Sequence, residues 1–348
     1  MDSAEKIGSD WARPALGVGP VRLSGRALLA PMAGVTDPAM RRIAERYGAS
    51  ATICEMITAS GVARGDRETA LRLAVSDETC AAPRVIQIAA RDSKEIAVAA
   101  RHAEEAGADW VDINMGCPCK RVTGGLAGAA LMRDLDQATA LIAAARAAIR
   151  APLTVKMRLG WDESSRNAPE LARRAEAEGV ALVTVHGRTR QQFYTGRADW
   201  PAIAKVKQAV SIPVVANGDC QSPEDAAAML KASGADAVMV GRAAQGRPWL
   251  VGDIAYYLAV GRRRAEPGLA ERGAVAREHL EGLIAQMGEG AGLRHARKHL
   301  AAYVDLAFGA ARADVAGLRR ALVTAEGPEE AFRLIEAIFN EGMQEVAA

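Results

Sequence analysis

Short apolar segments recur at steady intervals along most of the chain. Eight of them have the length and apolar character of buried strands: residues 28–34, 51–56, 84–89, 110–114, 153–159, 181–187, 213–218 and 237–241. Patterns of helical period separate most of these segments, among them 94–106, 135–149, 168–178 and 223–232. Strands that alternate with helices of this length indicate parallel strand–helix–strand units. Eight such units, with no further strand-like segment, predict a closed (β/α)8 TIM barrel.

An open, doubly wound sheet is the alternative fold. It is less favoured because no Gly-x-Gly-x-x-Gly motif follows the first segment. After residue 249 the alternation stops, and only helical periodicity continues, through 252–260, 270–288, 293–306, 314–322 and 328–340. We therefore expect a barrel domain over residues 1–259 and a small all-helical bundle over residues 260–348.

The composition agrees with a large folded protein. Of 348 residues, 50% are hydrophobic and 25% charged, which suits a barrel of about 250 residues with an appendage. The net charge of +2 gives no bulk electrostatic argument for nucleic-acid binding. Five scattered cysteines indicate reduced thiols rather than a disulfide framework. No signal-like or membrane-spanning apolar stretch is present in the sequence, so we expect a cytoplasmic protein.

Residues at the ends of the predicted strands are the candidates for chemistry, because the carboxyl ends of barrel strands converge on one site. They are Pro31, Met32, Ala33, Glu55, Gln87, Asn114, Cys117, Lys156, Arg158, His186, Arg188, Asn217, Gly218, Asp219, Gly241 and Arg242. Barrels commonly bind phosphate after strands 7 and 8, where Gly218, Gly241 and Arg242 offer backbone N–H groups and a guanidinium. We predict a phosphate site there, with ordinary strand-ending turns as the alternative.

Two cations in one strand also need an explanation. Alternation places Lys156 and Arg158 on the same side of the strand, inside the barrel, where they must meet something polar or anionic. A bound ligand is the favoured interpretation, and a buried salt bridge from Lys156 to Glu55 or Asp112 is the alternative. His186, at the end of its strand, is interpreted as a ligand contact rather than a core histidine.

Cys117 lies in a polar loop between Gly116 and Pro118. Zinc binding with Cys119 is disfavoured by the Cys-Pro-Cys spacing, and a disulfide between them would close a strained ring. A reactive or acidic thiol remains. Because an ordinary cysteine pKa is about 8.5, this thiol is mostly protonated at neutral pH and suits a general acid.

These segments together resemble the tRNA-dihydrouridine synthases, most nearly the bacterial B-type branch. The similarity extends along nearly the whole chain, and the glycine pair Gly124-Gly125 adds to its specificity. The motifs that carry it are Ala30-Pro-Met-Ala-Gly-Val-Thr-Asp37, Val85-Ile-Gln-Ile88, Asp112-Ile-Asn-Met-Gly-Cys-Pro118, Val155-Lys-Met-Arg158, Val185-His-Gly-Arg-Thr189, Ala216-Asn-Gly-Asp219, Val240-Gly-Arg242 and Arg294-His-Ala-Arg-Lys-His299.

The resemblance implies an FMN enzyme that reduces the 5,6 double bond of uridines in tRNA, with NADPH or NADH as electron source. Hydride from reduced FMN would reach uracil C6, and Cys117 would protonate C5. Lys156 would lie beside flavin N1 and O2, and Asn114, Arg158 and Arg188 would orient the uracil. The remaining residues implied to hold the cofactor are Pro31, Met32, Ala33, Gln87, His186, Asn217, Gly218, Asp219, Gly241 and Arg242.

A uridine of folded tRNA must turn out of its base stack to reach a barrel mouth, so the helical region is expected to hold the RNA. Residues 250–348 carry 12 Lys and Arg against 14 Asp and Glu, so binding must rest on local patches. Arg294 and Lys298, on the polar face of helix 293–306, form one patch, and 262–264 form another. His295 and His299 are spaced as metal ligands are, but no third ligand follows in sequence, and we predict no metal site.

Two other functions remain as alternatives. A flavin barrel acting on a small metabolite, as in the dihydroorotate dehydrogenases, would need no basic helical face. A non-catalytic RNA-binding protein would need neither Lys156 nor Cys117. We expect no membrane association and no obligate protein partner.

Overall fold

The computed structural model describes residues 16–66, 69–70, 72, 82–309 and 313–340. Within them, eight parallel strands form a closed barrel, because β3 pairs with β11 and β4 pairs with β6. The strands are β3 (Ala27–Leu29), β4 (Ala51–Ile53), β6 (Arg84–Ala89), β7 (Trp110–Met115), β8 (Leu153–Arg158), β9 (Leu182–His186), β10 (Val214–Asn217) and β11 (Ala237–Val240). Each overlaps one predicted segment, so the barrel is confirmed and the open sheet is excluded.

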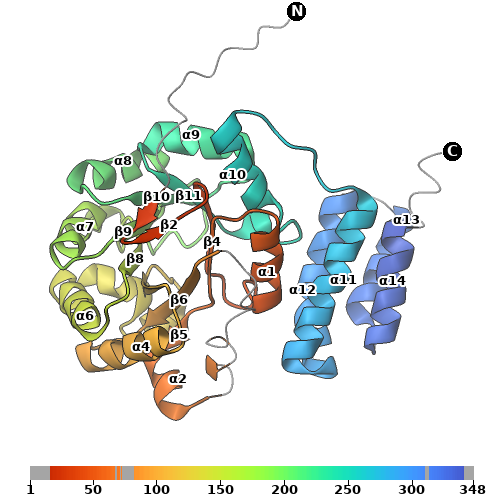
Figure 1. The fold of residues 1–348 in the computed structure, drawn as a ribbon, viewed down its shortest axis with the longest axis horizontal. Coiled ribbons are helices and arrows are strands. Elements are labelled where there is room, and N and C mark those ends of the chain that lie inside the picture. The colour runs from red at the N-terminus through yellow and green to blue at the C-terminus, as the bar shows by residue number, and fades with distance from the viewer. Residues whose placement is uncertain (1–15, 67–68, 71, 73–81, 310–312, 341–348) are drawn as a thin grey trace, which may run out of the picture.

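Helices surround the strands, as Figure 1 shows. They are α1 (Pro38–Arg46), α2 (Ala59–Arg64), α4 (Ser93–Glu105), α5 (Lys120–Thr123), α6 (Leu135–Ala148), α7 (Ala168–Ala177), α8 (Trp200–Ala209), α9 (Pro223–Ser233) and α10 (Leu250–Val260). Several begin at a side chain that caps the first free N–H groups, such as Asp92 before α4 and Ser222 before α9. The apolar layer between these helices and the strands is the main core.

Strand alternation decides which side chains enter the barrel. On β8, Leu153, Val155 and Met157 belong to the outer apolar layer, so Thr154, Lys156 and Arg158 face the interior. The lower interior is a separate apolar cluster that includes Leu28, Val85 and Trp110. The barrel is therefore apolar at its N-terminal end and polar at its C-terminal mouth.

Three short strands were not predicted from the sequence. A hairpin of β1 (Gly17–Val18) and β2 (Val21–Arg22) packs Val18 into the lower interior cluster. β5 (Ile57–Thr58) pairs with β6 beyond the end of β4. Two-residue strands carry too little alternation to be recognised in a sequence.

Helices α11 (Leu269–Met287), α12 (Glu289–Phe308), α13 (Ala313–Thr324) and α14 (Pro328–Asn340) follow and form a bundle. Its apolar core also includes Ile43 of α1 and Trp249. The bundle lies beside the barrel and is joined to it through the segment 261–268 (Figure 1). It packs on α1, where a Cβ on Gly282 would lie 2.6 Å from that of Ala39. We keep a domain boundary near residue 260 as a proposal. None of the described helices has the length and apolar character needed to cross a membrane.

Candidate active site at the mouth of the barrel

Two adjoining cavities open at the C-terminal ends of the strands. The first, about 400 Å³, lies beside the ends of β10 and β11, and the second, about 430 Å³, lies beside Cys117. We call them the β10–β11 cavity and the Cys117 cavity. Both are lined by Pro31, Met32, Lys156, His186, Tyr194 and Arg242. The first adds Asn217, Gly218, Asp219 and Gly241, and the second adds Ala33, Gln87, Asn114, Cys117 and Arg158. The two cavities thus bring together the candidate barrel residues, apart from Glu55 and Arg188.

At the β10–β11 cavity, the conformation of the backbone lets a ligand approach it closely. Gly218 has φ of 117°, and a Cβ there would lie 2.8 Å from the Cβ of Ala198 and 3.2 Å from His186 Nε2. Asp219 also has positive φ, 59°. Arg242 is exposed at this edge, with its guanidinium 3.7 Å from the Asp219 carboxylate. A glycine cradle next to an exposed guanidinium is an arrangement that receives an anionic group.

Arg188 lies behind this cavity rather than in its lining. It is 2% exposed, and its guanidinium donates to both oxygens of Asp219 at 2.9 and 2.6 Å. It also donates to the carbonyls of Thr195 and Gly196. Arg188 therefore holds the loop after β9 and orients the Asp219 carboxylate.

Lys156 has a neutral partner. Its Nζ donates to Asn217 Oδ1 at 3.1 Å, and Asn217 Nδ2 in turn donates to the carbonyl of Met239. Glu55, one of the two salt-bridge candidates, pairs with Arg72 instead, at 3.2 Å. Burial, reinforced by the charge of Arg158, lowers the pKa of Lys156 to about 8. The ammonium thus lies at the cavity wall without an ion pair in the described part of the chain.

A row of hydrogen bonds crosses the barrel interior beneath Cys117. Thr154 Oγ1 and Gln87 Nε2 donate to the two oxygens of Asp112 at 2.6 and 2.7 Å. Asn114 Nδ2 donates to Gln87 Oε1 at 2.7 Å, and Asn114 Oδ1 accepts from the backbone N–H of Cys117 at 2.8 Å. Burial raises the pKa of Asp112. The row fixes the orientation of both amides and ties the Cys117 loop to the barrel.

Cys117 is a partly exposed free thiol. Burial raises its pKa above the ordinary value, so the thiol is protonated at neutral pH. Its carbonyl accepts from Ala129 N–H at 3.1 Å, and a Cβ on Gly128 would lie 3.2 Å from Cys117 Cβ. Gly128 has φ of 60°, and a Cβ on Gly124 would lie 2.8 Å from the carbonyl oxygen of Lys120, so both positions favour glycine. Among the other cysteines, Cys80 lies outside the described residues.

Arg158 links the two loops of the mouth. Its Nε donates to the carbonyl of Gly116 at 2.8 Å, and its Nη1 donates to the carbonyls of Thr189 and Phe193 at 2.9 Å. Burial lowers its pKa to about 10. Burial and the surrounding cations, led by Lys156, also lower the pKa of His186, so its imidazole is neutral.

Tyr194 lines both cavities and was not recognised in the sequence. It is 50% exposed, and the guanidinium carbons of Arg242 and Arg158 lie 4.6 and 5.5 Å from its ring centre. Phe193, which precedes it, has φ of 48°, a strained conformation for a bulky residue. The loop after β9 has no periodicity that would mark Tyr194; the one signal is an aromatic pair close behind a candidate strand end.

The predicted RNA contacts lie outside the cavities. Arg294 and Lys298 are exposed on α12, and the Lys298 ammonium lies 3.3 Å from the position of a Cβ on Gly34 in the barrel. In the second patch, Arg263 pairs with Glu224, and Arg264 with Asp253, while Arg262 is exposed. The first patch therefore offers more free charge near the barrel mouth.

This chain is similar to known proteins along most of its length. The profile described as Dihydrouridine synthase (Dus) matches residues 28–342. The probable tRNA-dihydrouridine synthase of Rhizobium leguminosarum bv. phaseoli is 46% identical over 90% of this chain and 95% of that protein. The tRNA-dihydrouridine synthase B of Xanthomonas campestris pv. campestris is 42% identical over 93% of this chain and 95% of that protein.

One solved structure extends the comparison of fold. The 6-hydroxypseudooxynicotine amine oxidase of Pseudomonas geniculata N1 aligns with a TM-score of 0.56 at 14% identity. The alignment covers 81% of this chain and 54% of that one, so the chain spans about half of its length. At this identity the similarity shows the fold alone.

Proposed function

The chain belongs to the dihydrouridine synthase family, and we propose that it reduces selected uridines of tRNA to 5,6-dihydrouridine. The observation that carries this proposal is that Lys156 and Cys117 line the same cavity. The protonated thiol of Cys117 and the ammonium of Lys156 would then both face a ligand bound in this cavity. Adding hydrogen across a pyrimidine double bond needs a hydride and a proton; Cys117 would give the proton, and Lys156 would stabilise the negative charge that develops on the bound ligand.

Flavin mononucleotide fits the residues of this mouth. Gly218 leaves room that a side chain would fill, Arg242 offers a guanidinium for a phosphate, and Lys156 is a cation without an ion pair in the described residues. When bound, FMN would supply the hydride for uracil C6, with NADPH or NADH as the reductant that regenerates it. Apolar contacts would come from Pro31, Met32 and Ala33, and polar ones from Gln87, His186, Asn217, Asp219 and Gly241.

Cys117 acts in this proposal as the general acid. Its raised pKa keeps the proton on sulfur at neutral pH, so the thiol is ready to protonate uracil C5. Asn114 sets the position of the thiol by accepting the N–H of Cys117. The Asn114 amide nitrogen carries two hydrogens and donates one to Gln87, which leaves the other for a uracil oxygen.

The two arginines have different proposed roles. Arg158 lines the Cys117 cavity and joins the loops of Cys117 and Tyr194, so it orients the uracil and the acid together. Arg188 acts through Asp219 and the loop after β9, and we assign it as a positioning residue.

The RNA must lie across the barrel mouth and α12. Reaching Cys117 requires the uridine to leave its base stack, and backbone contacts from Arg294 and Lys298 would hold the RNA while it does. We propose that the enzyme works in the cytoplasm, as a protein without membrane attachment or an obligate protein partner.

The test is flavin reoxidation by unmodified tRNA. Purified protein is expected to be yellow or to bind FMN on reconstitution, and its reduced form is expected to be reoxidised by tRNA with formation of dihydrouridine. Cys117→Ala should keep FMN and lose most turnover. Cys119→Ala is the matched control, because Cys119 is exposed in the same loop, and it should retain activity.

Other results would support the alternative functions. Reoxidation by a small pyrimidine but not by tRNA would favour a metabolite reductase. Protein that binds tRNA but cannot take up FMN would favour a non-catalytic RNA-binding protein. Full activity of Cys117→Ala would remove Cys117 from the role of acid.

A further inference from the structure

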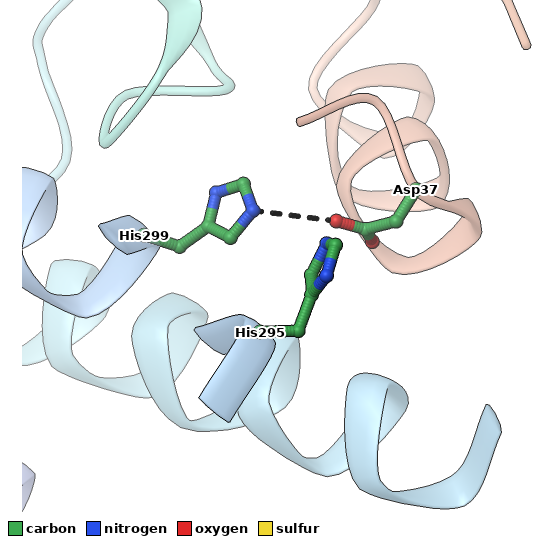
Figure 2. Close-up of side chains that lie close together, drawn as sticks. All are labelled: Asp37, His295 and His299. Carbon is green, nitrogen blue, oxygen red and sulfur yellow. Dashed lines mark ion pairs between the residues drawn. The ribbon is translucent and has the colours of Figure 1, made fainter. Parts of the chain in front are cut away.

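A buried cluster of imidazoles and one carboxylate lies between the barrel and the bundle. Asp37 is the residue before α1, at the end of the loop that follows β3, and His295 and His299 are one turn apart on α12. Figure 2 shows the three side chains converging from the two parts of the molecule. Asp37 is 2% exposed and His299 1% exposed, while His295 is half-buried and lies at the rim.

The spacing of these groups suits a small cation, contrary to the prediction from the sequence, because the fold brings Asp37 beside His295 and His299 as the third group. One ligand atom from each of Asp37, His295 and His299 lies within 4.8 Å of the others. His299 Nε2 is 3.5 Å from Asp37 Oδ2. In a tetrahedral zinc site with bonds of about 2.0–2.1 Å, neighbouring ligand atoms are about 3.3–3.5 Å apart. A small inward movement of His295 would complete such a set.

His299 also lacks the partners that a buried imidazole needs. Neither of its ring nitrogens has a hydrogen-bond partner within the described structure, although the side chain is almost fully buried. A buried polar atom without a partner destabilises the folded state, so such atoms are rare. His299 Nε2 therefore faces Asp37 Oδ2 at 3.5 Å without a hydrogen bond, a separation that suits two ligands of one cation.

The surroundings supply supporting contacts. Asp37 Oδ1 accepts from the N–H of Met40 and so fixes the carboxylate, which leaves Oδ2 facing the imidazoles. His279 Nε2 lies 3.2 Å from Asp37 Oδ2, and its Nδ1 lies 3.2 Å from the Tyr303 hydroxyl. A carboxylate fixed by a hydrogen bond, here from the N–H of Met40 to Oδ1, is the pattern found around protein metal ligands, and His279 contacts the same Oδ2 that would bind the ion.

We propose that Asp37, His295 and His299 bind one divalent transition-metal ion, with zinc the best match to two imidazoles and a carboxylate. A cavity of about 460 Å³ adjoins the site and is lined in part by Asp37, His295, Arg41 and Glu55. It would supply water as the fourth ligand. The ion links the loop after β3, which also carries Met32, to the bundle. This site is separate from the proposed reduction of uridine.

Lys298 is the group that competes with a bound cation. Its ammonium lies 3.3 Å from His295 Nε2. The side chain is exposed, so the ammonium can turn toward solvent when His295 binds the ion. Competition of this kind would weaken the site rather than abolish it.

The experiment measures metal content and uses neither tRNA nor flavin, so its failure would leave the proposed function untouched. Untagged protein is stripped with a chelator, loaded with excess zinc chloride, passed through gel filtration and analysed by mass spectrometry for metals. Wild type is expected to hold stoichiometric zinc and to unfold at a higher temperature after loading. Cobalt loading should produce the visible absorption of a tetrahedral site.

The variants separate metal binding from folding. His295→Ala changes a half-buried residue and should lose the zinc with an unchanged circular dichroism spectrum. Asp37→Asn keeps a capping oxygen for α1 and should also lose the zinc. His102→Ala removes an exposed histidine on α4 and should retain it. Wild type that holds no zinc, or His295→Ala that holds as much as wild type, would overturn the proposal and leave a cluster of side chains without metal.

Discussion

The backbone N–H of Cys117 donates a 2.8 Å hydrogen bond to the side-chain oxygen of Asn114. The side-chain nitrogen of Asn114 donates to Gln87, whose own side-chain nitrogen donates to Asp112. The loop that carries the thiol is therefore fixed to the barrel wall. The position of the Cys117 thiol therefore depends on Asn114, which is itself held by Gln87. Removing that residue should change the rate of protonation more than the binding of tRNA.

Asn114→Ala should lower the single-turnover rate with tRNA on the order of 100-fold, since small displacements of a catalytic group have effects of this size. FMN content should stay near that of wild type. Asn114→Asp keeps an oxygen for the Cys117 N–H but cannot donate to Gln87. Its single-turnover rate should lie between those of wild type and Asn114→Ala. A wild-type rate in Asn114→Ala would show that the loop is held by other contacts.

The pH dependence of turnover should follow the protonation state of the Cys117 thiol. Burial raises the pKa of Cys117, so the protonated form is present at neutral pH and is lost as pH rises through the raised value. At saturating FMN, turnover with tRNA should therefore decline on the alkaline side, above the ordinary cysteine value of about 8.5. Cys117→Ser should be slow and lack this decline, whereas Cys119→Ser should keep it. A decline that persists in Cys117→Ser would assign it to another group.

The fold was largely predictable because it rests on local patterns. Segments 110–114 and 153–159 have the apolar character of buried strands, and β7 and β8 lie there. The partners of polar residues were not predictable. Lys156 meets Asn217 rather than Glu55 or Asp112, and which strand ends meet depends on barrel register. Asp37 meets His299 because α1 packs against the bundle, a contact that no local pattern encodes.

Lys156→Met should make the protein without flavin more stable. Burial lowers the pKa of Lys156 to about 8, so below that pH the folded state contains an unfavourable buried charge, and the cost disappears as pH rises toward the unfolded value. Removing the charge should add on the order of 2–3 kcal/mol to the free energy of unfolding at pH 7. Urea denaturation of the protein without flavin measures it, and the gain should shrink between pH 8 and pH 10.

The same substitution should weaken FMN binding. In wild type, FMN affinity should fall as pH rises through about 8, because the ammonium that faces the cavity loses its proton. Lys156→Met should bind FMN more weakly at pH 7 and show no such dependence, as fluorescence titration would reveal. Lys207→Met is a matched control, since Lys207 pairs with Asp236 away from both cavities. An unchanged affinity in Lys156→Met would place the cation outside the flavin site.

Gly218→Ala should damage flavin binding and stability together. A Cβ would meet Ala198 at 2.8 Å, and alanine is strained at φ of 117°, so the loop must move away from the β10–β11 cavity. We expect a loss of more than about 1 kcal/mol in stability and a clear fall in FMN affinity. Gly234→Ala separates the two effects. Gly234 also has positive φ, 64°, but a Cβ there has no contact closer than 4.0 Å, and it ends α9 outside both cavities. This control should lose stability and keep FMN affinity, and an equal loss of affinity in both variants would show that strain alone is responsible.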